Sequence, residues 1–522
     1  MSRKEYNEYF SKIKINQENF EKMLDFIKKP NDFNEKIEIA QNALFYATYT
    51  NTGYFTSSVL ENFFIEYANL IDIENYDIEY KPNSFLHVLT QGYNVGGHTR
   101  VVERWIDNAP SNQAHSVVLL NPNNEKLDEL ERIIKNKNGK YIEFETNLSL
   151  KERALKLRKL ALEYKYIILH THMEDPSATV AFGTEKFTRP VLFYNHSSHT
   201  FWIGKGVSDV HLDLLLDDEI TTIKRDIKDK FFIGIPMKNI NFKNVNKLEL
   251  RKKLNLPLDK KIIISAGSCF KYRPICNDNF IENVKEIIDK DTYVYVIGVD
   301  ESDKIWSNAH KESKGHIIPL GYIDFEKGYM DYIGSADLYL DSFPCGGYTA
   351  IIDAISLGVP SLTLKTVLPQ LDYISNTTAF CENVNELVCK AKKILNNKEY
   401  ATLLIQDVRE SLIKNLSKEA WNKKIDELLK IVPQKHKVKH FFNETDYHEI
   451  DDLAVMCNFL ANINFKKEKT RSYTLDEIKY GLLYKKIGIP FIFQILKYRR
   501  NNCKVKVIKI FNNIILHYKD KK

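Results

Sequence analysis

Apolar residues recur every three or four positions over the first 84 residues, which predicts helices. The segments "YFSKIKINQENFEKMLDFIKK" and "NEKIEIAQNALFYATYT" show this spacing. A third, "TSSVLENFFIEYANLI", begins with Ser and Thr residues that are candidate helix caps. We therefore treat residues 1–84 as a helical N-terminal region.

From residue 85 the pattern changes to short apolar runs separated by helix-like stretches. "SFLHVLTQ", "HSVVLLN", "KYIILHTH" and "PVLFYNH" are typical of buried strands. A second set begins near residue 260, with "KIIISAG", "YVYVIG", "HIIPLG", "ADLYLD" and "PSLTL". Strands that alternate with helices predict parallel, doubly wound sheets.

Gly, Pro and Asn residues punctuate residues 231–243 and separate the two sets of strands. The sequence thus predicts an α/β protein with two Rossmann-like domains, at residues 85–236 and 237–432. A basic and helical C-terminal region, residues 433–522, follows them. Ligands of such sheets bind beyond the carboxyl ends of the strands, so the candidate chemistry is sought there.

Composition agrees with a cytoplasmic globular protein. The 522 residues are 43% hydrophobic and 28% charged, and they exceed the size of a single core. The seven cysteines form no CxxC pair, which favours reduced thiols over a disulfide framework or a zinc site. The first residues, "MSRKEYNEYFSKIK", contain no apolar signal-peptide core, and no window is apolar over the length of a membrane span.

Charge is concentrated at the C-terminal end of the chain. Residues 466–522 contain 16 Lys and Arg against four Asp and Glu, whereas the whole chain has a net charge of +6. Such a segment favours an anionic partner such as a membrane surface, a nucleic acid or an anionic glycan. A solvated helical face is the alternative interpretation.

The stretch "DSFPCGGYTAIIDAISLGVPS", residues 341–361, is the strongest candidate site. A helix that begins after Gly346 and Gly347 would present free backbone N–H groups and a positive dipole end to a diphosphate. Thr349 could donate its hydroxyl group to the same anion. Asp353, a lone carboxylate on an apolar helix, would bind ribose hydroxyls. The alternative is an ordinary turn with Asp353 at the surface.

Two cations follow the first strand of the second domain, in "SAGSCFKYRPICND". Lys271 or Arg273 would neutralise a departing diphosphate. The alternative is a pair of solvated charges.

In the first domain, "QGYNVGGHTRVVERW" places Gly97 and His98 at a predicted helix start. His98 would act as a general base or bind a phosphate, and an exposed histidine is the alternative.

A further polar group follows "RPVLFYN", where Asn195, His196 and His199 lie at a strand end. The spacing of the two histidines, with His170 and His172 at another strand end, raises a metal site as one option. No carboxylate triad or Cys partner accompanies them, so we favour hydrogen bonds to sugar and phosphate and expect no metal.

These motifs resemble those of the O-GlcNAc transferase family and its bacterial relatives, the cytosolic N-glycosyltransferases. "SCFKYRP" resembles the family's Phe-x-x-x-Tyr-Lys stretch, "HIIPLGYI" with Tyr322 resembles the strand and loop that hold uracil, and the segment after "ADLYLD" matches nearly position by position. The resemblance implies that Tyr348 and Thr349 contact phosphate, that Asp353 binds ribose and that His98 lines the active site. The chain departs from the family at Tyr348, Ala350 and Arg273, where the family has His, Thr and Lys, and it shows no tetratricopeptide array.

The resemblance implies a GT-B glycosyltransferase that uses a nucleotide sugar, most simply a UDP-hexose or UDP-HexNAc, by an inverting, metal-independent reaction without a cofactor. We expect a glycan, a lipid-linked glycan or a surface-polysaccharide precursor as acceptor, with peripheral contact to the inner membrane face through the basic tail and no nucleic acid partner. A protein acceptor, a non-catalytic partner subunit of another transferase and a nucleotide-sugar epimerase are the alternatives.

Overall fold

The computed structural model describes most of the chain. Its described residues are 3–71, 78–94, 97–123, 125–215, 220–237, 242–243, 245–274, 278–324, 328–347, 349–366, 372–441, 446, 449–451, 454–455, 457, 504–510 and 513–519.

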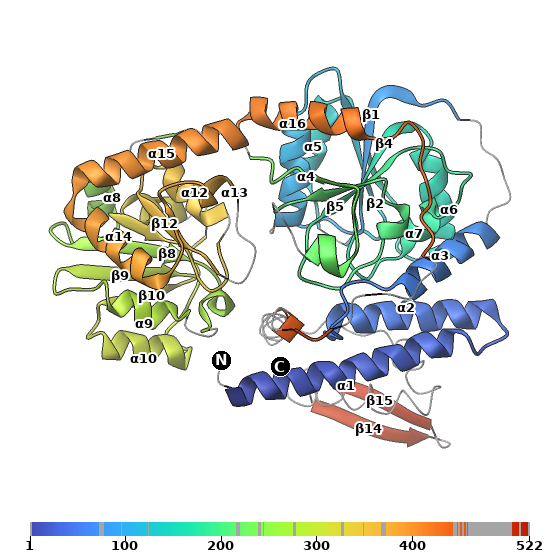
Figure 1. Ribbon diagram of the computed structural model, residues 1–522, viewed down its shortest axis with the longest axis horizontal. Coiled ribbons are helices and arrows are strands. Elements are labelled where there is room, and N and C mark those ends of the chain that lie inside the picture. Colours follow the sequence, from blue (N-terminus) through green and yellow to red (C-terminus); the bar gives the residue numbers. More distant parts are fainter. Residues whose placement is uncertain are drawn as a thin grey trace.

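The first 70 residues form the predicted helices α1 (Arg3–Ile27), α2 (Phe33–Tyr49) and α3 (Ser58–Leu70). Ser57 caps α3, because its side chain accepts a hydrogen bond from the N–H of Leu60. The apolar faces of these helices do not form a core of their own. They are buried in one hydrophobic cluster with residues of the first sheet, so the helical region is packed onto the first domain (Figure 1).

The first domain contains a parallel sheet of seven strands in the order β3-β2-β1-β4-β5-β6-β7. Long apolar strands that are buried on both faces explain this arrangement, because helices cover both sides of the sheet. The strands are β1 (Lys81–Leu89), β2 (Ala114–Leu119), β3 (Tyr141–Glu143), β4 (Tyr164–His170), β5 (Val191–Asn195), β6 (Val210–Asp213) and β7 (Lys230–Phe232). The helical segments are α4 (Gly97–Asn108), α5 (Asp128–Asn136), α6 (Leu150–Ala161), α7 (Ser177–Phe182), η1 (Lys205–Val207) and η2 (Ile220–Lys224).

The second domain has a parallel sheet of six strands in the order β10-β9-β8-β11-β12-β13. Its strands are β8 (Lys261–Ala266), β9 (Thr292–Ile297), β10 (Ile317–Gly321), β11 (Leu338–Leu340), β12 (Ser361–Leu364) and β13 (Phe380–Cys381). Its helical segments are α8 (Lys247–Lys253), η3 (Cys269–Tyr272), α9 (Phe280–Lys285), α10 (Lys304–Glu312), α11 (Tyr329–Gly334), α12 (Thr349–Ser356), α13 (Asp372–Ser375), α14 (Val384–Asn396) and α15 (Lys398–Leu416). The two predicted doubly wound sheets are thus confirmed.

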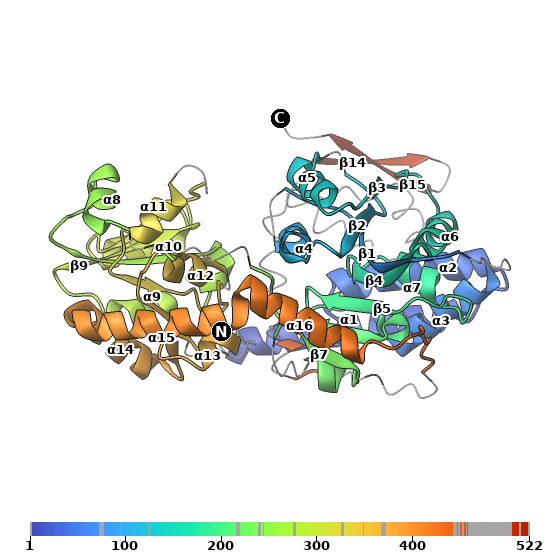
Figure 2. The same ribbon diagram turned by 90° about the horizontal axis from the view of Figure 1, so that it is seen from above.

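The chain returns to the first domain through helix α16 (Lys418–Ile431), which follows α15 after the single residue Ser417. Trp421, Ile425 and Leu428 of α16 are buried in a cluster with Trp105 of α4 and residues of the first sheet. Figures 1 and 2 both show α15 beside the second domain and α16 reaching the first.

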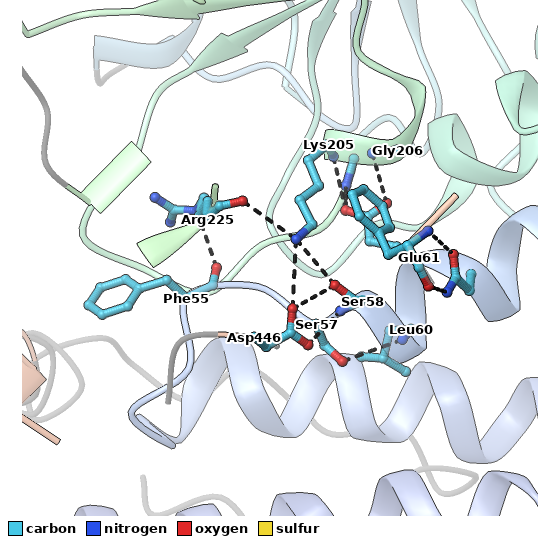
Figure 3. Close-up of polar contacts among 12 residues, drawn as sticks. Phe55, Ser57, Ser58, Leu60, Glu61, Lys205, Gly206, Arg225 and Asp446 are labelled. Carbon is cyan, nitrogen blue, oxygen red and sulfur yellow. Dashed lines mark hydrogen bonds and ion pairs between the residues drawn. The ribbon is translucent and has the colours of Figure 1, made fainter. Parts of the chain in front are cut away.

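A buried polar network joins the N-terminal helices to the first domain and to the segment after α16 (Figure 3). The Glu61 carboxylate of α3 accepts hydrogen bonds from the backbone N–H groups of Gly204, Lys205 and Gly206, at 2.6, 2.9 and 3.3 Å. The Lys205 ammonium lies 3.7 Å from the Asp446 carboxylate, which also accepts hydrogen bonds from Ser58. Because these groups are withdrawn from water, their mutual hydrogen bonds hold the three segments in one arrangement.

The C-terminal region differs from the helical prediction where it is described. Residues Lys504–Ile510 and Asn513–Lys519 form the antiparallel strands β14 and β15. The alternation of Lys with Val and Ile in "KVKVIKI" has a period of two, which favours a strand over a helix. Most of the basic segment at residues 466–522 lies outside the described residues. Within the described part of the chain, no helix combines the length and apolarity needed to cross a bilayer.

Candidate active site

The Gly-rich stretch of the second domain connects β11 to α12, as predicted, and is organised around a residue that the sequence analysis missed. Asp341 is only 4% exposed. Its carboxylate accepts hydrogen bonds from the N–H groups of Ser342 and Gly347, at 3.0 and 2.9 Å, and from the Thr363 hydroxyl at 3.3 Å. A carboxylate buried at a strand end, directly before the glycines, was the available signal for this role.

This arrangement corrects the role predicted for Gly347. Its N–H group donates to Asp341 and is therefore not free for a diphosphate. A side chain at this position would bring a Cβ atom within 2.5 Å of Asp341 Oδ1, which explains the need for glycine. Gly346 contributes its carbonyl group, which accepts a hydrogen bond from Lys271.

The two predicted cations have different surroundings. Lys271 Nζ lies 2.8 Å from the Gly346 carbonyl oxygen, so this lysine supports the loop directly. Burial raises the pKa of Asp341 to about 6, and the nearby Lys271 charge opposes that rise. The Arg273 side chain has a buried Nε–H group without a hydrogen-bond acceptor among the described residues. A buried donor of this kind suits an anion that the protein itself does not supply.

Asp353 of α12 faces the first domain. The Tyr329 hydroxyl group donates a hydrogen bond to it, and the Arg104 guanidinium of α4 is close enough to act on its charge. Burial raises the pKa of Asp353 to about 6, while Arg104 and Tyr329 oppose the rise. Asp353 is therefore not an isolated surface carboxylate, and Arg104 and Tyr329 are site residues that the sequence analysis missed.

The remaining residues predicted on the donor side are more exposed. Thr349 is the first residue of α12 and is exposed, as is Tyr322 on the loop after β10, with 81% of its surface accessible. Tyr348 lies outside the described residues. Their predicted contacts with a nucleotide stay predictions.

His98 is the second residue of α4, directly after the exposed Gly97, as predicted. Its Nε2 lies 2.7 Å from the backbone carbonyl oxygen of His170. A carbonyl can only accept a hydrogen bond, so Nε2 must carry the proton and Nδ1 must hold the lone pair. Nδ1 is buried and has no partner within the described part of the chain.

Burial lowers the pKa of His98 to about 4, the His172 charge adds to this effect, and the His170 carbonyl opposes it. The imidazole is therefore neutral near pH 7 and can accept a proton at Nδ1. A Cβ atom added at the neighbouring Gly97 would meet no atom within 4 Å, so the space beside Gly97 itself is open.

The three residues predicted at the end of β5 differ in their surroundings. His196 is half-buried, and its ring centroid lies 4.2 Å from that of His98. Asn195 is 2% exposed, and its amide group binds Asp213, Thr221 and the N–H of Ser197, so its predicted role toward a substrate is replaced by one in shaping the loop. His199 is exposed.

Nothing in the described ranges gathers three or more His, Cys, Asp or Glu side chains into a possible metal site. The candidate site thus has a neutral imidazole on the first domain and, on the second, two half-buried cations and a constrained loop.

No protein-family model matches the chain, and no curated protein matches its sequence. Solved structures do match its fold. Anabaena Alr3699/HepE in complex with UDP is 13% identical, with 66% of this chain and 99% of that chain covered and a TM-score of 0.52. A glycosyltransferase from Rickettsia africae is 14% identical, with coverage of 67% and 98% and a TM-score of 0.50. These similarities confirm the expected fold of two Rossmann-like domains, as in GT-B glycosyltransferases.

Proposed function

We propose that this protein is a glycosyltransferase that moves a sugar from a nucleotide donor, most simply a UDP-sugar, to a glycan or lipid-linked acceptor. The observation that carries the proposal is the unpaired lone pair of His98 Nδ1 at the sheet end that faces the second domain. A neutral imidazole with a lone pair can take the proton of an acceptor hydroxyl group, and a substrate phosphate or solvent is the alternative acceptor.

The second domain would hold the donor. Arg273, with its unpaired Nε–H, would bind the diphosphate and stabilise its departure, and Lys271 would keep the loop in place behind it. Thr349 at the start of α12 would add a hydroxyl donor, and Asp353 would accept hydrogen bonds from ribose. The presence of UDP in the HepE structure supports a uridine nucleotide as the first donor to test.

The first domain would bring the acceptor. Its hydroxyl proton passes to His98 Nδ1, the oxygen keeps the electron pair and attacks the sugar carbon, and the bond from that carbon to the diphosphate breaks. The departing negative charge is neutralised by Arg273. The scheme is proposed without a cofactor or a metal ion, as the resemblance implies.

Protein acceptors form the second candidate class within this function, because the motifs resemble a family of protein glycosyltransferases. A surface-polysaccharide or lipid-linked acceptor is favoured by the basic residues at 466–522, which suit an anionic membrane surface.

The proposal is tested by thermal unfolding of the purified protein with UDP, GDP, CMP and dTDP, with Asp353→Ala as the matched variant. A ligand that binds only the folded state raises the melting temperature. We expect a rise with UDP that Asp353→Ala loses. No rise with any nucleotide would favour a non-catalytic partner subunit, and conversion of the donor sugar without an acceptor would favour an epimerase.

A further inference from the structure

Four histidines form a diagonal line across the first sheet, on the adjacent strands β2, β1 and β4 and just after β5. His115 of β2 pairs with Phe85, two residues before His87 on β1, and His170 of β4 pairs with Leu89, two residues after it. Residues two apart on a strand share a face. Each histidine is thus one strand over and about two residues nearer the carboxyl end of the sheet than the previous one.

Hydrogen bonds connect these rings in sequence. His115 Nδ1 lies 3.0 Å from His87 Nε2, His87 Nδ1 lies 3.0 Å from His170 Nε2, and His170 Nδ1 lies 2.8 Å from His196 Nε2. At the far end, His115 Nε2 lies 3.3 Å from the side-chain oxygen of Gln113. Every link therefore joins the Nδ1 atom of one ring to the Nε2 atom of the next.

This head-to-tail order restricts the protonation of the whole line. A neutral imidazole has one N–H donor and one lone pair, so all four rings must carry the proton on the same type of nitrogen. A mixed state would place two N–H groups or two lone pairs against each other. The Gln113 oxygen can only accept, which selects the state with every proton on Nε2.

The rings are kept neutral by their surroundings. His87, His115 and His170 are fully buried, and burial lowers the pKa of His87 to about 3 and the pKa values of the others well below 6.5. Trp105 of α4 packs edge-on against His87 and His170. Burial beneath this apolar side chain thus favours neutral imidazole rings over protonated ones.

We propose that Gln113, His115, His87 and His170 are positioning residues that fix the proton of His196 on Nε2. His196 Nδ1 then holds a lone pair, on a ring next to that of His98, and is a second proton acceptor for the substrate. Among the described residues, the hydrogen bond of the His196 ring is made by Nε2, and the centroids of the His196 and His98 rings are 4.2 Å apart. Only one part of this proposal rests on the proposed function, namely that His196 Nδ1 accepts a proton from the substrate.

For the reaction, the consequence is that two neighbouring imidazole rings, those of His98 and His196, can accept one proton between them. A proton from the acceptor hydroxyl forms a bond to Nδ1 of either ring, while the oxygen keeps its electron pair. The charges that face His196 are those of His98 and His172, which oppose a second protonation. The site would therefore take up a single proton in each transfer.

The test is nitrogen NMR of the intact protein with 15N-labelled histidine rings, assigned by single substitutions. We expect His196 to show a protonated Nε2 and a lone pair on Nδ1. In Gln113→Leu the terminal acceptor is gone, so His115 Nε2–H loses its partner. The line should then shift toward the opposite state and move the His196 proton to Nδ1, four links away.

Two further variants complete the design. His87→Phe interrupts the line and should leave His196 with a mixture of both protonation states. His98 should keep its proton on Nε2 in that variant, because a backbone carbonyl holds it. His211→Phe is the matched control, since His211 is equally buried in the same sheet, packs against the rings of Phe193 and Trp202, and lies outside the line.

A His196 proton on Nδ1 in the native protein, or no change in Gln113→Leu and His87→Phe, would overturn the proposal. These readouts need no substrate, so they stand apart from the proposed function. If transfer is observed, His87→Phe should lower kcat about tenfold with the donor KM unchanged, since the donor lies on the other domain. If NMR shows the expected protonation states but no sugar transfer is detected, the histidine proposal would stand and the proposed glycosyltransferase function would be contradicted.

Discussion

The two sheet ends that make up the candidate site are built in different ways. At the first, side chains from three neighbouring strands and from the residue just after a fourth bind one another, and the groups involved are neutral imidazoles. At the second, one buried carboxylate and one lysine hold a backbone loop, and the groups involved are charged. The histidines fix the direction in which lone pairs point, so they serve to accept a proton. The loop of the second domain fixes the position of charge, so it serves to hold a leaving anion. A group transfer requires both.

The largest effect should come from His98→Asn, which removes the buried lone pair of His98 Nδ1 at the first sheet end and leaves the second sheet end intact. We expect kcat for transfer to fall about 10²- to 10⁴-fold, because a general base contributes on that order. Steady-state kinetics with a nucleotide sugar measure this, and the nucleotide-induced rise in melting temperature should persist. His310→Asn is the matched control, because His310 also binds a backbone carbonyl but lies in α10. Equal loss in both variants would contradict the difference between the two ends.

A smaller effect should come from Lys271→Met, which removes the charge at the second sheet end. The Gly346 carbonyl loses its donor and Asp341 loses its neighbouring cation, so the loop is less firmly held. We expect nucleotide affinity, measured by calorimetry, to fall about tenfold, as for one charge-assisted hydrogen bond. Lys285→Met, which removes a lysine bound to Glu282 and Glu312 on the surface of the same domain, should leave affinity unchanged. Undiminished affinity in Lys271→Met would show that the lysine does not support the donor loop.

The smallest effect concerns stability and pH. The pKa of Asp353 is raised to about 6, so its favourable contribution is complete below its unfolded value near 4 and is lost as the pH rises through 6. Asp353→Asn should therefore raise the melting temperature at pH 7.5, by about 2 °C, and change it little at pH 4. Asp291→Asn should act in the opposite direction at pH 7.5, because Lys260 lowers the pKa of Asp291. Thermal unfolding at both pH values measures the difference, and a melting temperature lowered in Asp353→Asn at pH 7.5 would refute it.

Much of this fold follows from the sequence, because apolar runs and helical periodicity are local properties. The strands "SFLHVLTQ" and "KIIISAG" and the loop before Thr349 were found in that way. The histidine line was not, since its members are separated by 28, 83 and 26 residues and meet only through the register of parallel strands. His87 within an otherwise apolar strand was the available signal, because a buried imidazole needs partners.

The electrostatic interaction between Arg104 and Asp353 could not be predicted either, because it depends on how one domain faces the other. Asp341 was within the quoted motif but has its partners on a loop and on β12, which a single sequence does not reveal. The role of Gly347 was misassigned for the same reason. The local sequence pattern was thus sufficient to locate the candidate site. Which of its polar atoms lack a hydrogen-bond partner depends on tertiary contacts.

Helix α16 has a consequence for synthesis of the protein. Trp105 of α4 and Tyr194 of β5 are buried in one cluster with Trp421 of α16 and its neighbours. Helix α16 is translated about 200 residues later than strand β6. At a translation rate of about 5–20 residues per second, the apolar surface that α16 covers stays exposed for about 10–40 s during synthesis. The first domain is therefore the earliest to begin folding and the last to be completed, and a chain that stops before residue 418 would expose this surface to chaperones.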